Sequence, residues 1–265
     1  MKFRTRVLAP LAAAALLAGG FGAAQAQDNA DLAAIQKAGA IRIGTEGTYA
    51  PFSFHDASGK LVGFDVDLGR AVAAKLGVKA DFVEGRWDGL IAGLDAKRYD
   101  VVINQVGINA ERQAKFDFSE PYISSPAVLV VRADDTSIRS FAELKGKKSA
   151  NTITSNFGKL AKANGAEVVP VQGFNEAIDL LLSRRVEATV NDKLSYLDFK
   201  QHKPNAPVKI AAEATGAAIE SSGVLLRKGQ PALRAAINKA LGEIKADGTY
   251  KAISERYFGV DVSKH

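Results

Sequence analysis

The chain has 265 residues, no cysteine and a formal net charge of +6, with 35 Lys and Arg residues against 29 Asp and Glu residues. The lack of cysteine excludes disulfide bonds and a cysteine-linked lipid tether, so stability must come from a buried core, which this length allows in one or two domains. Basic residues alternate with acidic ones and form no long run, which argues against nucleic-acid binding.

The N-terminal residues have the pattern of an export signal. Basic residues at 2–6 precede an apolar run at 7–17, and small residues at 24–26 form a cleavage motif. A membrane anchor is the alternative, but the run is interrupted by proline and glycine and is shorter than the roughly 20 apolar residues of a span. We therefore expect residues 1–26 to be a signal peptide and the remaining chain to be a monomer in the periplasm of a Gram-negative bacterium.

The first half of the chain alternates short apolar strands with amphipathic helices. Helical periodicity and the stop signal at Gly77 place the first helix, and β-rich runs place the strands. The predicted order is strand 41–45, helix 65–76, strand 80–84, helix 88–97 and strand 101–104. Such a β-α-β-α-β order predicts parallel strands joined by right-handed crossovers.

The same pattern recurs in the second half, after a strand at 127–132 and a capping box at 140–143. The predicted elements are strands 149–153, 167–171 and 187–191, with helices 155–164 and 175–185 between them, followed by helices 230–246 and 249–257. Two α/β units of this size predict two lobes with a cleft between them. Ligands of such sheets bind beyond the carboxyl ends of the strands.

Three short motifs lie at or near these strand ends: Glu46-Gly47-Thr48-Tyr49, Trp87-Asp88-Gly89 and Val102-Ile103-Asn104-Gln105-Val106. Two more, Gly248-Thr249 and Tyr257-Phe258-Gly259, lie in the helical C-terminal part. With these motifs, over residues 32–264, the chain resembles the polar amino-acid-binding proteins of bacterial ABC importers, and most closely the cystine-binding proteins among them. The resemblance implies an α/β fold of the two-lobed, type II periplasmic-binding-protein kind, each lobe a mostly parallel sheet flanked by helices.

The resemblance also implies how the chain is divided. Lobe 1 would be discontinuous, made of residues 27–121 plus 223–265, and lobe 2 would be residues 126–217. Segments 122–125 and 218–222 would form a hinge about which the lobes open and close around a ligand.

Two charged residues are the main candidates for binding the ends of an amino acid. The resemblance implies that Arg112 holds the ligand carboxylate through a two-pronged contact, although a surface arginine paired with Glu111 or Asp117 is the plainer alternative. It implies that Asp192 receives the ligand ammonium, and a helix N-cap is the alternative role for an Asp after a strand.

Three aromatic residues are candidate walls of the cleft, because rings can enclose an apolar or disulfide side chain and attract cations. They are Tyr49, Phe52 and Trp87. Core packing is the alternative, and it is more plausible for Phe52 than for Trp87, which follows a strand between Arg86 and Asp88.

Polar groups complete the expected site. Ser155 and Asn156 begin a predicted helix, whose N–H groups suit a carboxylate, although the loop that starts at Thr152 lacks the glycines usual in such proteins. Glu46 either meets the ammonium or is a solvated loop residue. Asn104 and Gln105 lie at a strand end, where buried amides need partners.

Gly107 departs from the family pattern, which has threonine at this position. Losing one hydrogen bond to a charged group typically costs ~1.5–3 kcal/mol, or roughly tenfold to hundredfold in Kd. Either water replaces the missing hydroxyl or the ligand is not a plain α-amino acid.

The sequence gives little support for catalysis, a metal or a cofactor, because His55, His202 and His265 have no partner spaced for metal binding or nucleophile activation. The resemblance implies a periplasmic receptor that delivers a polar amino acid, with L-cystine as the leading candidate, to an inner-membrane ABC permease. Two alternatives stay open: a cyclohexadienyl or arogenate dehydratase-like enzyme on the same fold, with Glu46 or Glu220 as proton donor, or a ligand-sensing partner of a chemoreceptor.

Overall fold

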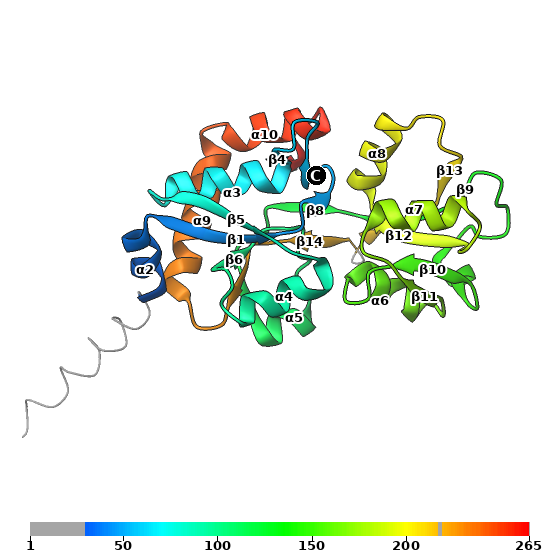
Figure 1. The fold of residues 1–265 in the computed structure, drawn as a ribbon, viewed down its shortest axis with the longest axis horizontal. Helices are drawn as coiled ribbons and strands as arrows, with labels where there is room; N and C mark the ends of the chain where they lie inside the picture. Colours follow the sequence, from blue (N-terminus) through cyan, green and yellow to red (C-terminus); the bar gives the residue numbers. More distant parts are fainter. Residues whose placement is uncertain (1–29, 217–218, 265) are drawn as a thin grey trace, which may run out of the picture.

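The computed structural model describes residues 30–216 and 219–264. These residues form two α/β lobes that lie side by side (Figure 1). The expected signal peptide at 1–26 lies outside the described residues, as does position 218 of the expected hinge. None of the helices described here combines the length and the apolar character that crossing a membrane requires.

The larger lobe is built on a five-stranded sheet in the order β5-β1-β6-β15-β7. Strand β1 (Ala40–Thr45) pairs in parallel with β5 (Lys79–Glu84) and β6 (Val101–Val102). Strand β15 (Leu225–Arg227) lies antiparallel to β6 and to β7 (Phe116–Phe118), so a late part of the chain completes a sheet that begins near residue 40.

Helices cover both faces of this sheet because the strands are buried on both sides. One face packs against α3 (Phe64–Lys75), α9 (Pro231–Ala246) and α10 (Thr249–Phe258), and the other against α4 (Trp87–Asp95). Helix α2 (Ala30–Ala38) lies at the outer end and α5 (Ala110–Lys115) beside α4 (Figure 1). The three-stranded hairpin sheet of β2 (Thr48–Tyr49), β3 (Ser53–His55) and β4 (Leu61–Val62) extends from this lobe.

The smaller lobe is built on a sheet in the order β11-β10-β12-β9-β13. Its central strands β10 (Lys148–Asn151), β11 (Glu167–Pro170) and β12 (Ala188–Asp192) are parallel, whereas β9 (Ala127–Arg132) and β13 (Val208–Glu213) are antiparallel to their neighbours. Helices α7 (Phe174–Leu182) and α8 (Lys193–His202) pack on one face. Helix α6 (Asn156–Ala163) and the 3-10 turn Phe141–Leu144 pack on the other.

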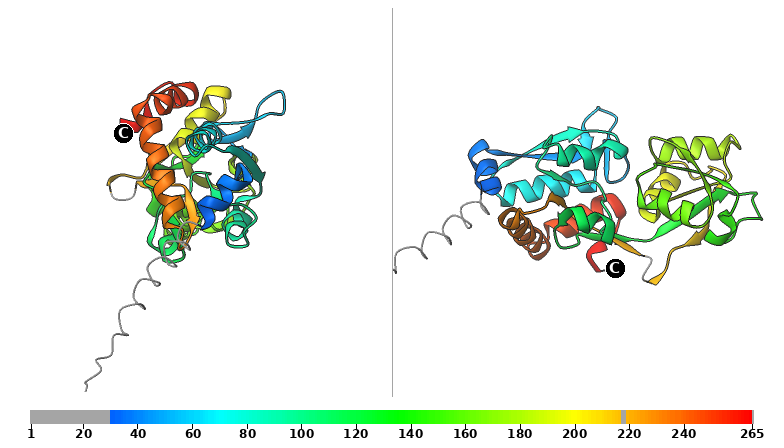
Figure 2. Two further views of the ribbon diagram at one scale, coloured as in Figure 1. Left: turned by 90° about the vertical axis from the view of Figure 1, so that its left-hand side faces the viewer. Right: turned by 90° about the horizontal axis from the view of Figure 1, so that it is seen from below.

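Two extended segments run between the lobes, coloured green and gold in Figure 2. They are β8 (Ile123–Ser125) and β14 (Glu220–Ser222), which pair antiparallel, and the hydroxyl groups of Ser124 and Ser221 lie 2.7 Å apart. The side chain of Glu220 lies outside the described part of the structure. The mixed α/β architecture with two sheet-containing lobes confirms the fold class expected from the sequence.

Candidate functional site

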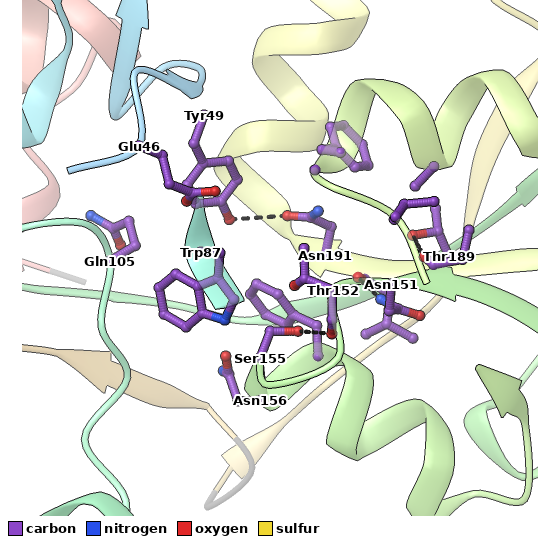
Figure 3. Close-up of a pocket in the computed structure, with 17 residues that line it drawn as sticks. Glu46, Tyr49, Trp87, Gln105, Asn151, Thr152, Ser155, Asn156, Thr189 and Asn191 are labelled. Carbon is purple, nitrogen blue, oxygen red and sulfur yellow. Dashed lines mark hydrogen bonds between the residues drawn. The ribbon is translucent and has the colours of Figure 1, made fainter. Parts of the chain in front are cut away.

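Two adjoining cavities lie between the lobes, where the carboxyl ends of the parallel strands face one another. Figure 3 shows the residues that line the first. The first has an empty volume of about 480 Å³, and the second of about 1210 Å³, including space open to solvent. Gln105, Asn156 and Phe157 line both. The expected site residues Glu46, Tyr49, Trp87, Thr152 and Ser155 line the first cavity, and Gly107 and Asp192 line the second.

Arg112 lies on α5 and is buried, with 5% of its surface exposed. Its Nη1 donates to the Gly107 carbonyl (2.9 Å) and its Nη2 to the Thr154 carbonyl of the other lobe (3.4 Å). The guanidinium carbon is 5.3 Å from the centroid of the Trp87 ring. Arg112 itself lines neither cavity, but it contacts one residue of each. Burial and these contacts distinguish it from an ordinary surface arginine.

The acidic residues near Arg112 have other partners. Glu111 forms an ion pair with Lys159 of the second lobe, and Asp117 with Lys228 and Arg234. Arg112 is therefore a buried residue and not a surface arginine.

Trp87 is the first residue of α4, and its ring lies against the first cavity with 6% of the residue exposed. Its Nε1 is buried and has no hydrogen-bond partner within the described part of the chain. A buried donor of this kind is costly unless an acceptor reaches it. The indole therefore offers both an apolar wall and one donor to whatever occupies the cavity.

Glu46 is held over the first cavity by Asn104. The Asn104 Nδ2 donates to Glu46 Oε2 (2.6 Å), and its Oδ1 accepts from Glu46 N (2.8 Å) and from Thr45 Oγ1 (3.0 Å). Burial raises the pKa of Glu46 to about 7, against the opposing effect of the Asn104 bond and with a smaller raising effect from Asp88. Asn104 is fully buried and lines no cavity, so the structure places it as a support for Glu46.

Gln105 is held in a similar way, by a residue that sequence reasoning missed. Its backbone has a φ of 51°, and both its N and its Nε2 donate to Asp65, at 2.7 and 2.8 Å. Asp65 is fully buried at the start of α3, and burial raises its pKa to about 7. The only sequence signal for Asp65 is an acid in the first turn of a helix, which most helices tolerate for other reasons.

Asp192 ends β12 and caps α8, accepting from Leu194 N (2.7 Å) and Ser195 N (3.3 Å). It also lines the second cavity beside Gly107 and Gln105. Burial raises its pKa to about 6, and the two backbone N–H donors moderate that rise. The N-cap role and a position facing the cleft are thus both present.

The start of α6 lies across the cavity from Trp87. Ser155 is the N-cap: its Oγ accepts from Gly158 N (3.0 Å) and donates to the Thr152 carbonyl (2.9 Å). Because the hydroxyl is used in the cap, Ser155 shapes the loop, while Thr152 and Asn156 present their own groups to the first cavity.

Phe52 does not form a wall of either cavity. It is fully buried in the core of the larger lobe, with its ring 5.1 Å from that of Tyr49 and 6.0 Å from that of Phe258. The structure therefore departs from the expectation of a cleft residue: Phe52 packs behind Tyr49 and supports it.

Gly107 pairs with Ser222 in an isolated antiparallel bridge at the edge of the second cavity.

Hydrogen bonds join the two lobes across the cleft. Tyr49 OH donates to Asn191 Oδ1 (3.0 Å), and Ser195 Oγ donates to the Ala50 carbonyl (2.9 Å). On the far side of Trp87, Asp88 Oδ1 accepts from both N and Oγ1 of Thr154, at 3.0 and 2.7 Å. These contacts bring the lobes together in a closed arrangement.

A family model and a relative of known name both match most of this chain. Residues 41–260 match the family described as bacterial extracellular solute-binding proteins, family 3. The L-cystine-binding protein TcyA of Bacillus subtilis is 47% identical over 245 residues, which are 91% of this chain and 90% of that protein.

Two solved structures show the same fold in different states. The L-cystine solute receptor of Neisseria gonorrhoeae, in its unliganded open conformation, is 50% identical and has a TM-score of 0.59, with 84% of this chain and 94% of that chain covered. An ancestral arginine-binding protein bound to arginine is 44% identical and has a TM-score of 0.78, with 83% and 99% covered. The less similar sequence gives the better superposition, and the lobes here contact each other across the cleft. Fold, cleft and sequence agree: the chain belongs to family 3 of the bacterial extracellular solute-binding proteins.

Proposed function

We propose that this protein is the periplasmic substrate-binding component of an amino-acid ABC importer and that L-cystine is its ligand. The observation that carries the proposal is the division of charge around one cleft. A buried guanidinium, that of Arg112, and the carboxyl of Glu46 come from one lobe, and the carboxyl of Asp192 comes from the other. An amino acid buried in the cleft needs partners for both of its charges.

In this proposal, Arg112 binds the α-carboxylate and Asp192 the α-ammonium, with the start of α6 near Asn156 adding backbone donors. Tyr49 and Trp87 enclose the side chain. Cystine suits these walls because its disulfide is apolar and polarizable. TcyA and the gonococcal receptor, both similar over nearly their whole length, are named for this ligand.

The mechanism is closure without chemistry. A ligand that contacts both lobes favours the closed arrangement, because only differential affinity for the two states shifts their populations. Segments 122–125 and 218–222 would act as the hinge between lobe 1 and lobe 2. The closed monomer would then deliver the amino acid to an inner-membrane permease.

Titration calorimetry of the purified protein tests the proposal. L-Cystine is expected to bind more tightly than glutamine, histidine or arginine. Tighter binding of a basic or acidic amino acid would overturn the cystine assignment and leave the receptor class intact. Incubation with prephenate or arogenate serves as the enzyme control, since formation of an ultraviolet-absorbing aromatic product would contradict a purely binding role.

A further inference from the structure

The first cavity continues into the smaller lobe, beneath the amino end of α7. Val171, Gly173, Phe174 and Ala177 line this extension, so its walls are mainly apolar. Glu46, contributed by the larger lobe, is the one acidic residue among those that line the cavity, and no Lys or Arg is among them. Any polar group of a ligand that reaches this extension must therefore form its hydrogen bonds with neutral side chains or with the backbone.

Two of the polar side chains in this extension already have partners. Asn151 Nδ2 donates to the Val190 carbonyl (2.7 Å), and its Oδ1 accepts from Ser149 (2.8 Å). Thr189 Oγ1 donates to the Ala150 carbonyl (2.7 Å). These bonds satisfy most of the hydrogen-bonding capacity of Asn151 and Thr189. Asn191 is therefore the polar side chain of the extension that can bind a ligand.

Asn191 is 9% exposed, and its orientation is fixed. Its Oδ1 accepts from the backbone N of Asp192 (2.7 Å), a group that can only donate, and from Tyr49 OH (3.0 Å). Its Nδ2 therefore lies on the side away from Tyr49, as Figure 3 shows, and has no hydrogen-bond partner among residues 30–216 and 219–264. Although the residue is nine-tenths buried, its Nδ2 is not fully enclosed, so an acceptor on a ligand in the first cavity can reach it.

Helix α7 supplies a second feature that favours a negatively charged group in the cavity. It has nine residues and begins after Gly173, which has no side chain to cap it, and the acid in its first turn, Glu176, accepts from Gln172 N (2.7 Å). Gly173 and Phe174 both line the cavity, so the positive end of the helix dipole lies at its wall. Across the cavity, Trp87 Nε1 is a further buried donor without a partner in the described chain.

We propose that Asn191 Nδ2 and the amino end of α7 form a subsite for a carboxylate at the far end of the ligand, and that Glu46 receives an ammonium at that same end. The ligand class is thus a molecule with an amino-acid group at both ends, and the subsite rests on the proposed function. Cystine fits this description, because a disulfide places its two α-carbons about 5.5–6 Å apart. A plain amino acid would leave the Asn191 donor unused.

The test compares two disulfides that differ at one group. L-Cystine has the far carboxylate, and the mixed disulfide of L-cysteine with cysteamine lacks it but keeps the sulfurs and the far ammonium. In calorimetry with the purified protein, the mixed disulfide is expected to bind roughly tenfold to hundredfold more weakly. Asn191→Asp keeps an oxygen for Tyr49 and Asp192 but replaces the donor with an acceptor. It is expected to remove most of this preference.

Tyr49→Phe is the matched control. It removes the same cross-lobe hydrogen bond from Asn191 but leaves Nδ2 in place, so it should weaken both disulfides equally and keep their ratio. Asn191→Ala is a second test of the donor in case Asn191→Asp does not fold, with thermal unfolding as the check on both.

The outcomes separate the two proposals. Equal affinity of the wild-type protein for the two disulfides overturns the subsite and leaves the cystine assignment. A preference that persists in both Asn191 variants also overturns it, because another group then reads the far carboxylate. Failure to bind either disulfide, with tight binding of another amino acid, overturns the cystine assignment and the subsite together.

Discussion

Neither Asn104 nor Asp65 lines a cavity, yet each fixes a residue that does. Asn104 holds Glu46 through two hydrogen bonds, and Asp65 holds Gln105 through two more. Partners of this kind remove rotamer freedom before a ligand arrives, which lowers the entropy lost on binding. At the scale of single residues, the site is therefore largely preorganised by groups that a ligand never touches.

Arg112→Ala is expected to weaken L-cystine binding by about thirtyfold or more, because truncating one partner of a buried charge pair costs ~2–5 kcal/mol. It should also lower the free energy of unfolding by ~1–2 kcal/mol, since the guanidinium donates to two carbonyls. Arg86→Ala, which truncates an exposed neighbour of Trp87, serves as the control and should change neither quantity. Calorimetry and thermal unfolding measure both effects, and an unchanged Kd would refute the carboxylate role of Arg112.

Binding should depend on pH, because burial raises the pKa of Asp192 to about 6 and of Glu46 to about 7. An ammonium needs ionised carboxylates, so Kd should rise as pH falls from 8 to 5, by roughly tenfold per unit below each pKa. The stability of the ligand-free protein should change in the opposite direction and increase as pH falls. The folded-state pKa values exceed the ordinary 3.8 and 4.5, so the folded state binds these protons more tightly and stability gains as pH falls from about 7 toward 4.

The control for this pH dependence is Asp192→Asn, which removes one titrating group. It should weaken binding at pH 8 and flatten the part of the profile that has its midpoint near pH 6. A wild-type Kd that stays constant between pH 8 and pH 5 would contradict ammonium binding by these carboxyls.

The helices and strands of the two α/β units follow the periodicity of the sequence closely. The helix predicted at 175–185 ends early, at Leu182, and two strands end early beside the site. The strand predicted at 101–104 ends at Val102, because Asn104 turns to hold Glu46 and Gln105 adopts a left-handed conformation bonded to Asp65. The strand predicted at 149–153 ends at Asn151 for a similar reason, since the Ser155 cap requires Thr152 in the loop.

The sequence could not predict which residues far apart in the chain contact each other. Phe52 and Tyr49 are three residues apart, and periodicity does not say which ring enters the core. Asn191 precedes Asp192 and looks like an ordinary strand residue until Tyr49, 142 positions away, is brought against it. Local pattern thus predicted most elements of the two α/β units but not α8 or β13, and the family resemblance supplied Arg112 and Asp192 as candidates. The groups that support the site depend on contacts between distant segments.

Ser155→Ala tests the start of α6. Loss of the N-cap typically costs ~1 kcal/mol, and for a chain of this size that lowers Tm by roughly 2–4 °C. Ser155→Asn keeps a capping acceptor and should restore most of the stability. Thermal unfolding monitored by circular dichroism measures the difference, and an Ala variant as stable as the wild type would show that the cap contributes nothing.

At the scale of the whole molecule, the lobes are joined by the two paired strands β8 and β14 and by a small number of hydrogen bonds across the cleft. The Glu111–Lys159 ion pair and the hydrogen bond from Arg112 to the Thr154 carbonyl also join the lobes. Exposed polar contacts of this kind each contribute little stability. A closed arrangement with so few direct contacts is what a receptor needs if the ligand is to decide between open and closed states.

Asp88→Ala removes the acceptor for both Thr154 donors and should shift the ligand-free protein toward an open arrangement. Kd for L-cystine is expected to rise by about tenfold or less, since the contact is exposed and lies outside the proposed ligand contacts. The radius of gyration of the ligand-free variant, measured by small-angle X-ray scattering, should exceed that of the wild type. Equal values would mean that this contact does not hold the lobes together.

The central claim is that an amino acid bound between the lobes holds them closed. Small-angle X-ray scattering of the wild-type protein, with and without saturating L-cystine, tests it most directly. With L-cystine, the radius of gyration should be smaller and the scattering curve should match the closed structure described above. A curve that L-cystine leaves unchanged and that differs from the closed structure in both conditions would contradict it.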